Sequence, residues 1–169
     1  MKFDYRFLSI IPIFAVPAVL LKSVFITVLL ITATIALSYF GSRTHLKKIG
    51  LELVTFTTIM IGVMYGLVPG AIIGAVLILI HDFLSGRIAP YLIIVVPCFG
   101  MLGALASIFS GADIVMLGVG LTILSHIVFV AWQTFTYRFP VNYLPYFVLN
   151  VIMNFFLFSN LAPKIIGLA

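Results

Sequence analysis

The chain has 169 residues, of which 64% are hydrophobic and only 8% are charged. A soluble domain carries about a quarter charged residues, so this composition excludes a water-soluble domain of ordinary kind. The net charge of +5 would suggest a nucleic-acid partner in a soluble protein. Here the basic residues flank apolar blocks, where they act as orientation signals in a membrane, so we expect no nucleic acid.

The apolar residues form blocks long enough to cross a bilayer as helices. The sequence therefore predicts an all-α fold, a polytopic transmembrane helical bundle of six to seven helices with no soluble domain. One integral membrane domain covers residues 1–169. Its predicted spans, in chain order, are 7–21, 23–40, 51–65, 68–84, 91–109, 114–135 and 143–161.

The first block, 7–21, is the weakest of the seven, because fifteen residues rise only about 22 Å as a helix. If all seven blocks cross, seven Lys and Arg residues lie on one side and two on the other. If 7–40 crosses once, the split is five against three, with Lys22 inside the membrane. The positive-inside rule favours seven crossings in a multi-pass protein of the cell membrane with a cytoplasmic N-terminus. Six crossings remain the alternative.

Between the third and fourth blocks, small residues recur at every fourth position. They are Gly62, Gly66, Gly70 and Gly74, with Ala71 and Ala75 beside the last two. Small residues at this spacing let membrane helices approach closely. The stretch 62–75 therefore packs helices within the chain or forms the interface to another membrane subunit. Pro69 interrupts the run and predicts a tight turn there.

The same stretch carries a family resemblance, through Tyr65-Gly66, Pro69-Gly70-Ala71, Gly74 and Asp82. This pattern resembles the second-to-third helix turn in S components of energy-coupling factor (ECF) transporters. Those small membrane proteins capture a vitamin or metal ion and pair with a coupling subunit and ATPases. The run 82–86, Asp-Phe-Leu-Ser-Gly, is also similar to a stretch of the rod-shape protein MreD, which implies a membrane scaffold. Both resemblances lie mainly in residues 51–86.

Further along the chain, polar residues lie within the apolar blocks. His126 is near the middle of 114–135, and Gln133 follows seven residues later on the same helix face. Asn150 and Asn154 are four apart and share a face. Polar and ionisable groups at membrane depth are costly and are candidates for function. Together with Trp132 they are predicted to line a ligand pocket, or to join helices through hydrogen bonds.

Charged residues near the block ends have simpler interpretations. Glu52 opens the third block beside two lysines, which predicts a solvated ion pair or a favourable helix-start charge. Asp82 is expected to pair with Arg87 at the membrane interface, and Asp113 is expected to cap the sixth helix. A proton relay through His81 and Asp82 is a further alternative, because histidine titrates near neutral pH.

No catalytic motif stands out, and no cluster of His, Cys and carboxylates has the spacing of a metal site. We therefore expect no enzyme, no metal and no cofactor. The favoured function is a substrate-capturing membrane subunit of an uptake transporter for a small solute, a vitamin or ion. It would contact membrane lipid and dock through 62–75 to partner subunits, which the resemblance implies are a coupling subunit and ATPases. The alternatives are a non-catalytic scaffold like MreD and an ion- or proton-handling subunit using His81, Asp82 and His126.

Overall fold

The computed structural model describes residues 11–44, 52–87, 89–136 and 141–168, with side chains from Lys22 onward. These residues form helices and no strands, so the all-α bundle is confirmed. The elements are α1 (Ile11–Arg43), α2 (Val54–Tyr65), α3 (Leu67–Leu84), α4 (Leu92–Ile108), α5 (Ile114–Thr136), the 3-10 turn η3 (Val141–Tyr143), α6 (Leu144–Asn160) and α7 (Ala162–Leu168).

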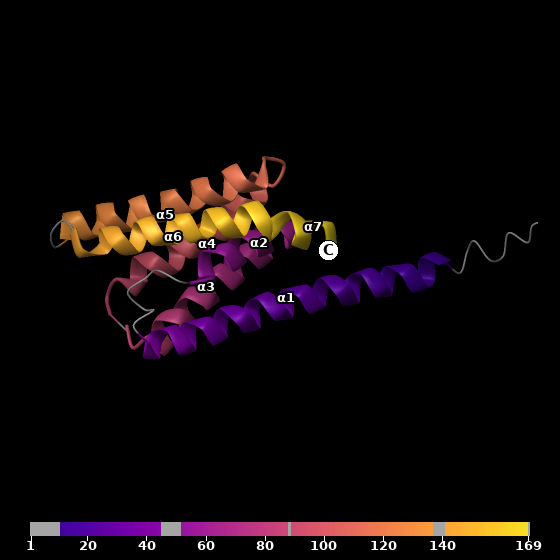
Figure 1. Ribbon diagram of the computed structural model, residues 1–169, viewed down its shortest axis with the longest axis horizontal. Helices are drawn as coiled ribbons and strands as arrows, with labels where there is room; N and C mark the ends of the chain where they lie inside the picture. The colour runs from indigo at the N-terminus through magenta and orange to yellow at the C-terminus, as the bar shows by residue number, and fades with distance from the viewer. Residues whose placement is uncertain (1–10, 45–51, 88, 137–140, 169) are drawn as a thin grey trace, which may run out of the picture.

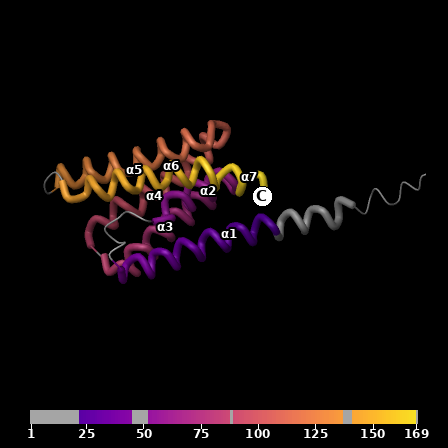
Figure 2. Tube along the Cα trace, in the orientation of Figure 1, coloured from indigo at the N-terminus to yellow at the C-terminus, as the bar shows by residue number. Residues whose placement is uncertain are grey.

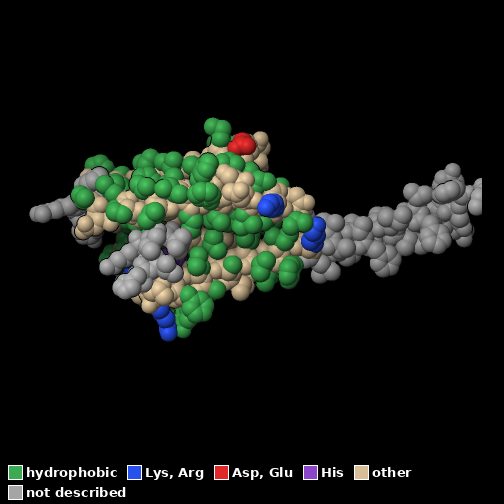
Figure 3. Space-filling model, viewed as in Figure 1, with side chains coloured by type: hydrophobic (Ala, Val, Ile, Leu, Met, Phe, Trp, Pro, Cys, Tyr) green, Lys and Arg blue, Asp and Glu red, His purple; other side chains and the backbone are tan. Residues whose placement is uncertain are grey.

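Within the part of the chain that the structure describes, four helical segments are long and apolar enough to cross a membrane: Lys22–Arg43, Leu67–Leu84, Ile114–Thr136 and Val141–Leu168. Apolar side chains cover most of the visible surface of the bundle (Figure 3). Large exposed hydrophobic residues occur on all four segments, from Phe25 on α1 to Phe156 on α6. A surface of this kind is unfavourable in water and favourable in lipid.

α1 is one continuous helix of 33 residues, where the sequence predicted two separate spans, 7–21 and 23–40. That predicted break is wrong, because Lys22 and Ser23 alone separate the blocks and lysine is readily accommodated within a helix. At 1.5 Å per residue the helix is about 50 Å long, well beyond the roughly 30 Å hydrocarbon core of a bilayer.

α2 is the centre of the bundle, although it is one of its shortest helices. Its twelve residues rise about 18 Å, and every side chain from Val54 to Gly62 is buried. It contacts α1, α3, α4, α5 and α6. Figures 1 and 2 show α1 along one side of the bundle and the pair α5 and α6 along the other. The other helices thus enclose α2.

The chain reverses between α2 and α3 at Gly66, not at Pro69 as the sequence predicted. Gly66 has φ +94°, a conformation that glycine adopts without steric cost. α3 then begins at Leu67, which leaves Pro69 in its first turn. There the missing proline N–H has no helical partner to lose.

The glycines of 62–75 bring α2, α3 and α4 into backbone contact. A Cβ atom on Gly70 would lie 2.6 Å from Cα of Gly62 and 2.7 Å from the carbonyl oxygen of Gly103 on α4. One on Gly74 would lie 2.5 Å from the carbonyl oxygen of Phe99. Gly62, Gly70 and Gly74 therefore pack within this chain, and the space beside their Cα atoms has no room for a second subunit.

The rest of the predicted interface also lies against α4. The Cβ position of Gly100 is close to the Ala71 carbonyl oxygen and the Ala75 side chain, and Gly66 is occupied by the turn. The outward face of α3 instead carries bulky aliphatic residues such as Val68, Ile72 and Val76. The helices thus pack through their small residues and present their large ones outward.

Candidate functional site

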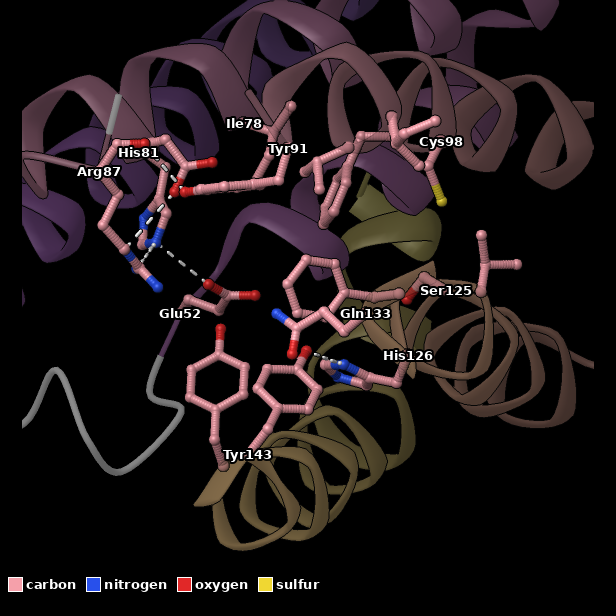
Figure 4. Close-up of a pocket in the computed structure, with 17 residues that line it drawn as sticks. Glu52, Ile78, His81, Arg87, Tyr91, Cys98, Ser125, His126, Gln133 and Tyr143 are labelled. Atoms are coloured by element: carbon pink, nitrogen blue, oxygen red, sulfur yellow. Dashed lines mark hydrogen bonds and ion pairs between the residues drawn. The ribbon is translucent and has the colours of Figure 1, made fainter. Parts of the chain in front are cut away.

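A cavity of about 240 Å³ opens where the elements diverge at one end of the bundle. Its walls come from the segment before α2, the second half of α3, the first half of α4, α5 and the start of α6 (Figure 4). Polar side chains gather in it despite the apolar composition of the chain. The lining residues are Glu52, Ile78, His81, Asp82, Arg87, Tyr91, Ile94, Val95, Cys98, Phe99, Ser125, His126, Val128, Phe129, Gln133, Tyr143 and Tyr146.

Glu52 is buried, with only 6% of its surface exposed. The prediction of a solvated carboxylate is therefore wrong. The residue lies two positions before the central helix α2, so the same packing that buries α2 also buries Glu52. Its Oε2 lies 3.3 Å from Nε2 of His81, and Tyr146 lines the cavity together with it. Figure 4 places Glu52 between the His81–Arg87 pair and Tyr143.

His81 connects α1 to the loop after α3. Its Nδ1 lies 2.9 Å from Oγ of Ser38, and its Nε2 lies 2.9 Å from Nη2 of Arg87. Because arginine can only donate, Nε2 of His81 must accept this bond. His81 is then neutral and carries its proton on Nδ1, which donates to Ser38. The Ser38 hydroxyl in turn donates a hydrogen bond to the Thr34 carbonyl oxygen, 2.7 Å away.

Asp82 and Arg87 form the ion pair that the sequence predicted, with Nε of Arg87 3.5 Å from Oδ1 of Asp82. Asp82 is buried within the protein, with 3% of its surface exposed. The Tyr91 hydroxyl donates to the Arg87 carbonyl oxygen at 3.0 Å.

His126 lies at the other side of the cavity and has both ring nitrogens engaged. Nδ1 is 2.7 Å from the Tyr143 hydroxyl, and Nε2 is 2.9 Å from Oδ1 of Asn150. The Asn154 amide donates to the same Oδ1 at 3.0 Å. Since Oδ1 only accepts, Nε2 of His126 donates to it and Nδ1 accepts from Tyr143. His126 therefore presents its ring, rather than a free nitrogen, to the cavity.

The predicted pocket residues divide into three groups. His126 and Gln133 line the cavity. Asn150 and Asn154 are fully buried behind His126 and hold it in place, so they belong to the same network without forming the wall. Trp132 is half-buried and is not part of the lining.

Sequence reasoning missed most of the charged and aromatic wall. Glu52 was assigned to a solvated position beside two lysines, and Asp82 and Arg87 were assigned to a separate pair at the membrane interface. The signal that could have joined them is the alternating direction of consecutive spans. When three consecutive helices are antiparallel, the first begins, the second ends and the third begins at the same end of the bundle. Glu52, Arg87 and Tyr91 occupy such positions.

The cavity can bind a small molecule by burial and hydrogen bonding. Among the residues that the structure describes, no group of three or more His, Cys, Asp or Glu residues could hold a metal ion. Asp113, by contrast, lies away from the cavity and caps α5 as predicted, accepting from the backbone N–H groups of Val115 and Met116 at 3.0 and 2.9 Å. No protein-family model, curated protein or solved structure matches the chain.

Proposed function

We propose that this chain is a multi-pass integral membrane protein that captures a small solute in the cavity between α3, α4, α5 and α6. The observation that carries the proposal is the cavity itself. A helical bundle that serves only as a scaffold can pack solid, whereas this one keeps about 240 Å³ open beside buried polar side chains. Concave, largely apolar pockets with a few convergent polar groups are typical of ligand sites.

The placement of charge supports a membrane environment. Of the described charged residues, Arg43, Asp113 and Lys164 lie near helix ends and Glu52, Asp82 and Arg87 line the cavity, whereas Lys22 lies within α1 at the start of a candidate span. Between them, the outward faces are apolar. Buried polar groups in lipid must find partners within the protein, and the rings of His81 and His126 and the side-chain NH2 of Asn154 do so.

The orientation prediction changes with α1. A cytoplasmic N-terminus depended on two crossings before Arg43, and α1 supplies one helix there. The count of basic residues then falls from seven against two to five against three, with Lys22 inside α1. The positive-inside rule no longer orients the bundle strongly.

The resemblance of residues 65–82 to S components of ECF transporters supports a transport role, in which the captured solute is the cargo to be taken up. In that role the chain hands its solute to a coupling subunit powered by separate ATPases. Because Gly62, Gly70 and Gly74 are used within the chain, a coupling subunit would dock on bulkier outward residues.

The test compares the solute retained by the wild type, Cys98→Phe and Met101→Phe, each purified gently from native membranes. Cys98 lines the cavity on α4, so Cys98→Phe places a ring in the open space. Met101 is on the same helix but is 64% exposed on the outer surface, so Met101→Phe is the matched control. We expect mass spectrometry to find a stoichiometric small molecule with the wild type and Met101→Phe, and none with folded Cys98→Phe.

Two outcomes would overturn the proposal. One is equal solute retention by all three forms, which would place the bound molecule outside the cavity. The other is a wild-type protein that carries no solute and co-purifies with a stoichiometric set of envelope-assembly proteins. That second result would favour the scaffold function implied by the similarity to MreD.

A further inference from the structure

The charged side chains of the cavity wall do not cancel. Two carboxylates, Glu52 and Asp82, and one guanidinium, Arg87, line it. With both carboxyl groups ionised and both histidines neutral, as in the hydrogen-bond pattern described above, the described wall carries one net negative charge. A buried charge without a partner is strongly unfavourable, so this negative charge favours a positively charged ligand.

The negative charge belongs to Glu52. Arg87 directs Nε toward Asp82 and Nη2 toward His81. Because His81 accepts from Arg87 at Nε2, it has no proton there to offer Glu52, although the two atoms are 3.3 Å apart. Among the described residues, no lysine or arginine forms an ion pair with Glu52, and its carboxylate contacts His81 at 3.3 Å.

An aromatic wall adjoins this carboxylate. Tyr91 and Phe129 meet edge to face with centroids 6.2 Å apart, Phe129 and Tyr143 are 4.9 Å apart, and Tyr143 stacks on Tyr146 at 5.1 Å. Four rings from three regions of the chain thus form a continuous surface that ends at Glu52. Aromatic faces attract cations electrostatically, most strongly where water is excluded, and they recognise ammonium groups in this way.

We propose that the captured solute is a small organic cation, with its ammonium group at Glu52 and its apolar body against Tyr91, Phe129, Tyr143 and Tyr146. This inference rests on the proposed function and narrows it to one class of solute. Metal cations fit poorly, because the described residues offer no cluster of three ligands. Anions would be repelled by the Glu52 carboxylate, which no described lysine or arginine neutralises. The cavity, about 240 Å³, is slightly below the range of about 300–1,000 Å³ typical of drug-sized ligands, so the cation is small.

The test measures the thermal stability and calorimetric binding of the purified full chain with four probes of similar size. Two are cations, 2-phenylethylammonium and choline. The others are the neutral 2-phenylethanol and the anion phenylacetate. We expect both methods to detect binding of the cations, with 2-phenylethanol and phenylacetate much weaker. This comparison uses the wild type alone and so does not depend on the folding of a variant.

Glu52→Gln removes the charge and keeps the shape of the side chain, and we expect it to weaken cation binding by about 10- to 100-fold. Asp113→Asn is the matched control, because it removes one negative charge from an exposed position outside the cavity. It should leave cation binding unchanged.

The inference is overturned if 2-phenylethanol or phenylacetate binds as well as the cations, if Glu52→Gln binds cations like the wild type, or if none of the probes binds. The proposed function fails separately, through the solute-retention experiment with Cys98→Phe. A retained anionic or neutral solute would thus support capture while rejecting the cation.

Discussion

Phe158 has no exposed surface, and its ring occupies the position where a side chain on Gly118 would lie. The ring also packs on Phe56 of the central helix, with centroids 4.9 Å apart. Gly118 is therefore required for the contact between α5 and α6. Two residues further along α5, a Cβ on Gly120 would meet nothing within 4 Å. α5 thus contains one glycine that the packing requires, Gly118, and one that can be replaced, Gly120.

We predict that Gly118→Ala destabilises the protein and Gly120→Ala stabilises it. Overpacking of a buried site typically costs about 1–3 kcal/mol, whereas replacing an unconstrained helical glycine by alanine gains about 0.5–1 kcal/mol. Thermal unfolding in detergent should show shifts of opposite sign. A rise in stability for both variants would mean that Phe158 does not lie over Gly118.

At the residue scale, the sequence identified the polar residues within the helices better than it predicted how buried each one is. The pattern indicated four polar residues within the membrane blocks as candidates for function: His126, Gln133, Asn150 and Asn154. Three of them, His126, Asn150 and Asn154, form one hydrogen-bonded chain. It did not reveal that Glu52 is buried, because burial depends on the neighbouring helices and not on the flanking lysines. Helix-face arguments compare residues within one helix, whereas the cavity is assembled from five parts of the chain.

α1 is attached to the bundle by a row of hydroxyl groups along one face. In the middle of α1, Thr27 bonds to the Tyr65 hydroxyl at 2.6 Å, and two turns further along Thr34 bonds to Thr57 at 2.7 Å. Near its end, Ser38 bonds to His81. The attachments follow the three- and four-residue spacing that puts side chains on one helix face.

The Thr34–Thr57 bond should contribute measurably to the docking of α1. We predict that a double-mutant cycle with Thr34→Val and Thr57→Val gives a coupling free energy of about 0.6 kcal/mol, the average for hydrogen bonds between membrane helices. Unfolding in detergent measures it. Thr32→Val is the control, because Thr32 is exposed on the same helix, and it should change stability little. A coupling free energy of zero would contradict a contribution from this bond.

Five of the seven predicted spans correspond to single helices with boundaries within about three residues, as for 68–84 and α3, Leu67–Leu84. Long apolar blocks with breaks at Gly, Pro or charged residues made these predictable. The first two spans failed, because a single lysine does not separate helices. The short length of α2 and its central position were not predictable, since hydropathy is the same for lipid and for a protein interior.

Across the whole molecule, close packing and open space lie at opposite ends. α3 and α4 are in backbone contact around Gly70 and Gly103, and again at Gly74 and Phe99. Beyond Phe99 the two helices carry larger residues, and the cavity begins there. The glycines thus bring α3 and α4 into backbone contact in one part of the bundle, and the cavity occupies another part.

The apolar exterior predicts where the molecule tolerates a charge. Ile127 is 54% exposed near the middle of α5, and Val141 is 64% exposed at the end of a candidate span. A lysine near the centre of a membrane helix costs about 2.5–3.5 kcal/mol for insertion, whereas one near the end extends its ammonium group to the interface. We therefore expect Ile127→Lys to reduce the yield of membrane-integrated, monodisperse protein strongly and Val141→Lys to preserve it, as measured by alkaline extraction followed by size-exclusion chromatography. Equal yields would mean that this face of α5 does not contact the hydrocarbon core, and it would then have to be covered by another protein surface.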